Sequence, residues 1–182
     1  MGQALAIEIW VHVVALVMYA LAVGLILFGT TMSRPGMVRA AHVVALVGVA
    51  MHSIALGLRW YGAGHGPYLT RYEVLSSNAW VTMALVQVIG WRQPKTRGVA
   101  LFLYPAVLLL LGSAVYTGPE VRMLPLTFRG IWLVLHVCFY FVAFAAALLS
   151  LGHGVLQLGS SAALARRMPN LPDAAALDRE SY

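Results

Sequence analysis

Residues 7–29 read IEIWVHVVALVMYALAVGLILFG, with Glu8 as the one charged side chain. An α-helix rises about 1.5 Å per residue, so this stretch is long enough to cross the roughly 30 Å hydrocarbon core of a bilayer. It therefore predicts a membrane-spanning helix. The six residues before it contain no basic side chain and no obvious cleavage site, so we do not interpret it as a removable signal peptide.

The rest of the chain repeats this pattern. Of 182 residues, 61% are hydrophobic and 10% are charged, whereas a soluble domain carries about 25% charged residues. The long unbroken apolar runs also exclude a transmembrane β-barrel, whose strands alternate apolar and polar residues. We predict an all-α, polytopic membrane protein with a transmembrane domain at 1–159 and a tail or linker at 160–182. The five predicted spans are residues 7–29, 38–60, 73–91, 99–116 and 130–158.

Basic residues gather on one side of these spans. Eight lie in or beside the loops 30–37 and 92–98 and in the tail: Arg34, Arg39, Arg92, Lys95, Arg97, Arg166, Arg167 and Arg179. The opposite side carries four: Arg59, Arg71, Arg122 and Arg129. The positive-inside rule therefore predicts an outer N-terminus and a cytoplasmic C-terminus. These short loops do not resemble a nucleic-acid-binding patch.

Histidine is the unusual residue of this sequence. Five of its six histidines fall within predicted spans, where polar side chains are costly and tend to mark functional sites. At helical rise, His12, His52 and His136 lie in an outer layer, and His42 and His153 lie near the inner boundary. A ladder of two haems would need both histidines of a helix on one face. The pairs are about 80° and about 100° apart, which disfavours the ladder and leaves one outer haem as an alternative.

Each histidine also has a simpler interpretation, which is a hydrogen bond to a neighbouring helix. His136 differs because it lies close to the outer start of the last span, between Trp132 and the aromatic residues Phe139 and Tyr140. Such aromatic residues commonly face lipid or pack between helices. His136 is nevertheless the strongest candidate for a ligand.

Residues 59–73, RWYGAGHGPYLTRYE, predict an ordered interfacial loop. Glu73 starts the third span, where the helix dipole favours a carboxylate, and either Arg71 or Arg59 is its expected partner. The third span carries a polar stripe that suits interhelical packing or, alternatively, a quinone pocket. That stripe consists of Ser76, Ser77, Asn78, Thr82 and Gln87.

Other chemistry finds little support. The single cysteine, Cys138, cannot form an internal disulfide or a cysteine zinc site. We find no hydrolytic or group-transfer motif, so a binding subunit is favoured over an enzyme. A proton relay through Glu8 and the membrane histidines stays open, although no inverted repeat points to a transporter.

Two stretches carry a resemblance to a known family. The first comprises His52, LGLRWY at 56–61, GHGP at 64–67 and Tyr72-Glu73, and the second is GIWLVLHV at 130–137. Together with the tail, they resemble the CcsA/ResC branch of the cytochrome c assembly family, which handles haem in membranes. The asparagine that usually precedes the family's Tyr-Glu pair is absent here. The family's tryptophan-rich outward segment would follow the linker, so the resemblance implies a shortened member or a second chain that supplies the rest.

The resemblance implies a b-type haem, held stably or in transit, with His136 as axial ligand and His52 as a weaker candidate. His65 and Trp132 are further candidate contacts. It implies a multi-pass protein of the bacterial cytoplasmic (inner) membrane, in contact with lipid, a second membrane chain and apocytochrome c. The alternatives are a structural or electron-transfer subunit of a respiratory complex, with a b-type haem or a quinol-facing surface, and histidines that serve packing alone.

Overall fold

The structure, a computed structural model, describes residues 2–120 and 130–159, except for the side chains of 2–5 and 94–96. These residues form the helices α1 (Gly2–Thr31), α2 (Pro35–Ala63), α3 (Arg71–Arg92), η1 (Pro94–Val99), α4 (Ala100–Thr117) and α5 (Ile131–Gly159). Within them, five helices are long and apolar enough to cross a membrane. The all-α membrane fold with five spans is therefore confirmed. The predicted tail at 160–182 lies outside the described residues.

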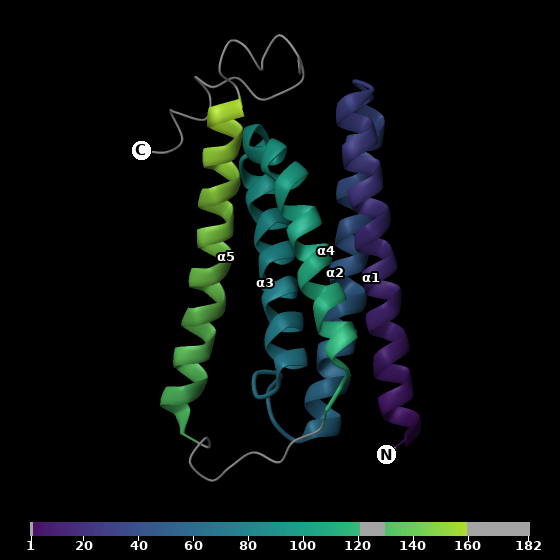
Figure 1. Cartoon of the computed structure of the whole chain (residues 1–182), viewed down its shortest axis with the longest axis vertical. Coiled ribbons are helices and arrows are strands. Elements are labelled where there is room, and N and C mark those ends of the chain that lie inside the picture. Colours follow the sequence, from purple (N-terminus) through teal and green to yellow (C-terminus); the bar gives the residue numbers. More distant parts are fainter. Residues whose placement is uncertain (1, 121–129, 160–182) are drawn as a thin grey trace.

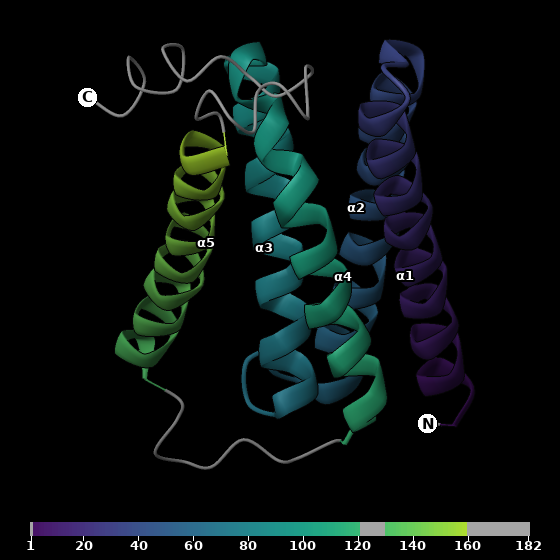
Figure 2. The same ribbon diagram turned by 45° about the horizontal axis from the view of Figure 1, so that its top comes forward.

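The five long helices run alternately up and down in one bundle (Figure 1). α1 packs chiefly on α2, and α3 packs chiefly on α4, while α1 also contacts α4. α5 lies beside α3 and η1 and stands apart from α1 and α2 in both views (Figure 2). Because neighbouring helices in the chain alternate in direction, the first turns of α1, α3 and α5 lie at the same end of the bundle as the last turns of α2 and α4. We call this end of the bundle the Glu8 end, and the opposite one the Arg39 end.

Local chemistry sets the helix ends. Ser33 adopts a left-handed φ of 54° in the turn after α1, and Pro35 then occupies the first turn of α2. α2 ends at Gly64, whose φ of 72° lets its N–H bond the carbonyl of Trp60. The helices extend beyond the predicted apolar spans because backbone hydrogen bonding continues past the residues that lipid would cover.

The contact between α1 and α2 depends on small residues. Ala15, Ala41 and Ala45 are fully buried, which lets the two helices approach closely. Gly48 is the tightest point, because an added Cβ would lie 2.6 Å from Cε1 of Tyr19. Tyr19 is itself fully buried, so its ring has little room to move.

Replacing Gly48 with alanine is therefore expected to lower the free energy of unfolding by about 1–3 kcal/mol, the usual cost of overpacking. Gly57→Ala in the same helix is the matched control, since a Cβ there meets nothing within 4 Å. Alanine favours helix by up to about 1 kcal/mol over glycine, so the control should not destabilise. Denaturation in detergent, followed by far-UV circular dichroism, measures both. Equal stabilities of the two variants would contradict this packing.

α5 is attached to the bundle along one side only. Its buried residues recur at helical spacing in its second half and include Ala145, Leu149 and Leu156. Gly152 brings the helix close to Val99, because a Cβ there would lie 2.9 Å from Val99 Cγ1. None of the residues 131–140 is buried. The end of α5 that belongs to the Glu8 end therefore extends from the bundle without packing into its core.

Candidate functional site

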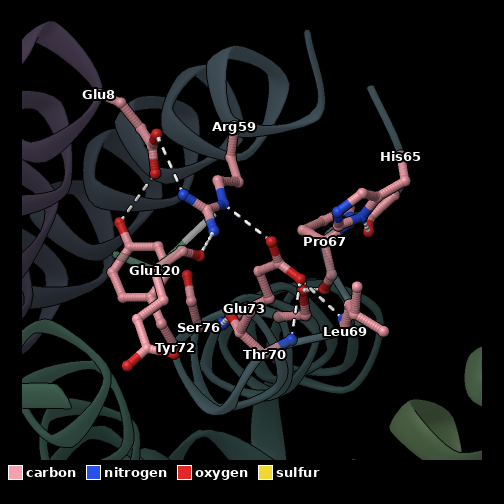
Figure 3. Close-up of polar contacts among 12 residues, drawn as sticks. Glu8, Arg59, His65, Pro67, Leu69, Thr70, Tyr72, Glu73, Ser76 and Glu120 are labelled. Carbon is pink, nitrogen blue, oxygen red and sulfur yellow. Dashed lines mark hydrogen bonds and ion pairs between the residues drawn. The ribbon is translucent and has the colours of Figure 1, made fainter. Parts of the chain in front are cut away.

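A buried arginine joins two carboxylates at the Glu8 end (Figure 3). Arg59 Nε donates to Glu73 Oε1 at 2.8 Å, and its NH1 lies 3.8 Å from Glu8 Oε2. All three side chains are buried, with Glu73 at 0% exposure. The NH2 group of Arg59 also donates to the backbone carbonyl of Glu120. One guanidinium therefore ties together α1, α2, α3 and the segment after α4.

Glu73 holds the loop before α3 as well. Its Oε2 accepts the backbone N–H of Leu69 at 2.7 Å and that of Thr70 at 3.0 Å. The hydroxyl of Thr70 accepts the N–H of Glu73 at 3.2 Å, which completes a capping box. The carboxylate thus satisfies two helix-start N–H groups and the arginine together, which explains how a charge can be buried here.

A chain of hydrogen bonds leads from Glu8 into the bundle. Tyr72 OH donates to Glu8 Oε1 at 3.0 Å and lies 2.9 Å from His12 Nδ1. The Ser76 hydroxyl lies between two imidazoles, 3.0 Å from His12 Nε2 and 2.8 Å from His52 Nε2. Tyr19 OH lies 3.3 Å from His52 Nδ1 and forms the inner end. We call these six residues the polar array: Glu8, Tyr72, His12, Ser76, His52 and Tyr19.

When Glu8 is ionised and both imidazoles are neutral, only one assignment of donors and acceptors satisfies the whole array. An ionised carboxylate only accepts, so Tyr72 donates its proton to Glu8. The proton of His12 then lies on Nδ1, whose acceptors are the oxygen of Tyr72 and, at 3.2 Å, the backbone carbonyl of Glu8. His12 Nε2 then accepts from the Ser76 hydroxyl. The oxygen of Ser76 in turn accepts from His52 Nε2–H, and His52 Nδ1 accepts from Tyr19. His12 and His52 are thus opposite tautomers, although their rings lie only 5.3 Å apart.

The loop histidine His65 is buried as well. Its Nδ1 lies 2.8 Å from the Gly66 carbonyl, so Nδ1 carries a proton and donates it to this oxygen. Its ring packs against Tyr68 at a centroid distance of 6.2 Å. The Ser77 hydroxyl donates to the carbonyl of Pro67 at 2.7 Å, which secures the loop to α3. This confirms the ordered loop expected between the second and third spans.

His136 has a different environment. It is exposed on the part of α5 that does not pack into the core. Trp132, one turn earlier, is 81% exposed, and Phe139 and Tyr140 are exposed beside it. Residues four apart share a helix face, so the imidazole lies among aromatic side chains on the outside of the bundle. We call this surface the His136 face, comprising Trp132, His136, Phe139 and Tyr140.

Comparison with curated proteins gives three similar sequences, and no protein-family model matches. The cytochrome c biogenesis protein CcsA of Synechococcus sp. (strain CC9902) is 33% identical over 138 residues, which is 71% of this chain and 44% of that protein. CcsA of Prochlorococcus marinus (strain NATL1A) is 35% identical over 99 residues, 50% of this chain and 30% of that protein. This chain is thus similar to part of CcsA. CcsA of Prochlorococcus marinus (strain NATL2A) is 34% identical over 118 residues, 61% of this chain and 36% of that protein.

The matches to CcsA cover less than half the length of each of these relatives. The likeness does cover most of this chain in the longest match. It therefore agrees with the resemblance seen in the sequence motifs.

The structure places the four candidate residues of this chain in three environments. His52 is 0% exposed, and both its ring nitrogens take part in the polar array. An iron at His52 would have to displace Ser76 or Tyr19. His65 belongs to the buried loop, while His136 and Trp132 share the His136 face. Glu73 pairs with Arg59, one of its two expected partners, and Arg71 is exposed.

Sequence reasoning missed most of the polar array, although a signal was present. Glu8, His12 and Tyr19 are four and seven residues apart, and Tyr72 and Ser76 are four apart. These spacings place the polar groups of each helix on one face. The polar stripe of α3 was noticed, but its relation to polar residues of α1 needs the three-dimensional packing.

Proposed function

We propose that this chain acts in cytochrome c biogenesis as a membrane haem-handling protein, and that His136 is an axial ligand of the haem. The observation that carries the proposal is the exposed imidazole of the His136 face. Every other described histidine of the Glu8 end is buried and hydrogen bonded. The similarity to CcsA supports the pathway.

The residues of the His136 face fit a haem. A porphyrin is a broad apolar plane, and Trp132, Phe139 and Tyr140 offer exposed aromatic surface around the imidazole. His136 would supply a nitrogen ligand, and a partner group on its second nitrogen would fix the tautomer. When bound, the haem supplies the reactive porphyrin edge and the redox-active iron, while the protein supplies ligation and orientation.

The remaining assignments follow from this proposal. The Glu8 end is the outer end, since the Arg39 end carries the larger number of basic residues. The haem is b-type, because it is held without a covalent bond, and it is passed on toward apocytochrome c. A second membrane chain completes the site, and the bilayer is the bacterial cytoplasmic membrane. His65 and Trp132 belong to the surroundings of the haem, and His52 is its second potential ligand after rearrangement of the array.

The test is a reduced-minus-oxidised visible spectrum of the purified chain with whatever copurifies with it, together with the cytochrome c yield of the same cells. The wild type should show a haem band, and His136→Ala should lower haem retention by about tenfold or more, since even outer-shell partners are worth 10–100-fold. Cytochrome c yield should fall in parallel.

His153→Ala is the matched control, because it removes a half-buried histidine from the same helix near the Arg39 end. It should leave both readouts unchanged. A band that survives in His136→Ala would overturn the ligand assignment. Loss of the band with normal cytochrome c yield would instead indicate an electron-transfer subunit.

A further inference from the structure

A cavity opens near the Arg39 end, between the first turns of α2 and the last turns of α3. Its volume is about 600 Å³. Its walls include Val43, Leu46, Val88 and Trp91, side chains that are 46–75% exposed on the outside of the bundle and would face lipid. The cavity is therefore reached from within the membrane.

One residue of the cavity lining, His42, carries an unsatisfied nitrogen. Gln87 Nε2 donates to Tyr104 OH at 3.0 Å, and Tyr104 OH lies 2.7 Å from His42 Nδ1. Among the described residues, His42 Nδ1 is the acceptor in reach of the phenol proton, so the proton of His42 belongs on Nε2. That Nε2 is buried and has no hydrogen-bond partner within the described part of the chain. A ligand with an acceptor oxygen would satisfy it.

The charges around the cavity specify that acceptor further. Of the residues that the structure describes, Arg39 and Arg97 line it and no acidic residue does. Arg97 donates its Nε–H to the carbonyl of Gly90 at 2.9 Å, so its other guanidinium nitrogens are left to bind other partners. The two guanidinium groups and the neutral imidazole of His42, beside apolar walls, suit a ligand with an anionic headgroup and a hydrocarbon chain. A neutral quinone ring would gain little from the two guanidinium groups.

We propose that this cavity binds one anionic phospholipid, whose phosphate pairs with Arg39 and Arg97 and whose hydrocarbon lies along Val43, Leu46 and Val88. The Nε2–H of His42 donates to an oxygen of the headgroup. The site is independent of the proposed haem function, because it lies at the other end of the bundle.

The test uses the purified, delipidated chain in detergent and native mass spectrometry, with dioleoyl phosphatidylglycerol or dioleoyl phosphatidylcholine added. At about 1 kcal/mol for each arginine near an anionic headgroup, the wild type should retain phosphatidylglycerol about tenfold better or more. Arg39→Gln with Arg97→Gln should bring retention down to the level of phosphatidylcholine.

Two further variants keep the test sharp. Arg34→Gln with Arg92→Gln changes the same charge at the same end outside the cavity lining, so it should retain the lipid. His42→Phe removes the donor while keeping a ring, and it should weaken retention without any change in net charge. Far-UV circular dichroism checks that each variant is folded.

Three outcomes would overturn the proposal. These are equal retention of the two lipids, equal loss in the Arg34/Arg92 control pair, or displacement of phosphatidylglycerol by millimolar inorganic phosphate. The last outcome would show a site for free phosphate in place of a lipid.

Discussion

Arg59→Met is expected to lower the free energy of unfolding by about 3–5 kcal/mol, the cost of leaving buried charges without their partner. Methionine keeps much of the side-chain volume but removes the guanidinium between Glu8 and Glu73. Two carboxylates would then face each other across a buried site. The variant should be unstable even though no apolar contact is deleted. Detergent-based denaturation followed by circular dichroism measures the effect.

A double-mutant cycle separates the ion pair from general damage. Glu73→Gln alone should also destabilise, because it leaves Arg59 with less compensation, while the combined Arg59→Met and Glu73→Gln variant should cost less than the sum. Arg71→Met is the matched control, since Arg71 is exposed at the start of α3, the helix that carries Glu73. It should change stability by no more than about 0.5 kcal/mol. If Arg59→Met behaved like this control, the buried ion pair would have no stabilising role.

Ser76→Ala is expected to cost about 2 kcal/mol, because one deletion removes the hydrogen-bond partner of both His12 Nε2 and His52 Nε2. The effect should be larger than that of an ordinary interhelical serine, which contributes to a single bond. Ser150→Ala, an exposed position on α5, is the control and should be close to neutral.

Nitrogen-15 chemical shifts of the labelled imidazoles check the same point independently of stability. In the wild type, His12 should carry its proton on Nδ1 and His52 on Nε2. The same tautomer in both histidines would contradict the direction derived for the array. In Ser76→Ala, the shifts of both histidines should change together.

The fold was predictable because its signal is local. Length and unbroken apolar character identify each span without reference to any other, and the structure describes five such helices. Glu73 was also placed correctly at a helix start, because a capping carboxylate acts on its own backbone neighbours.

The polar array was not predictable in the same way. Its bonds join residues 24 to 64 positions apart, such as His52 with Ser76 and His12 with Ser76. Which helix faces which depends on close packing at residues such as Gly48, and this information is distributed over several helices. The layer expected from helical rise placed His12 and His52 at one depth, and their rings indeed lie 5.3 Å apart. The serine between them was assigned only to a general polar stripe.

The uniform direction of the polar array makes it cooperative. Reversing one bond between Tyr19 and His12 would place two hydrogens, or none, in the next bond, so these bonds reverse together. At His12 the backbone carbonyl of Glu8, 3.2 Å from Nδ1, is a further acceptor for the ring proton and favours the direction described above. An ionised Glu8 permits only one of the two orientations. The donors of the array therefore all point toward Glu8, and their dipoles add along the bundle.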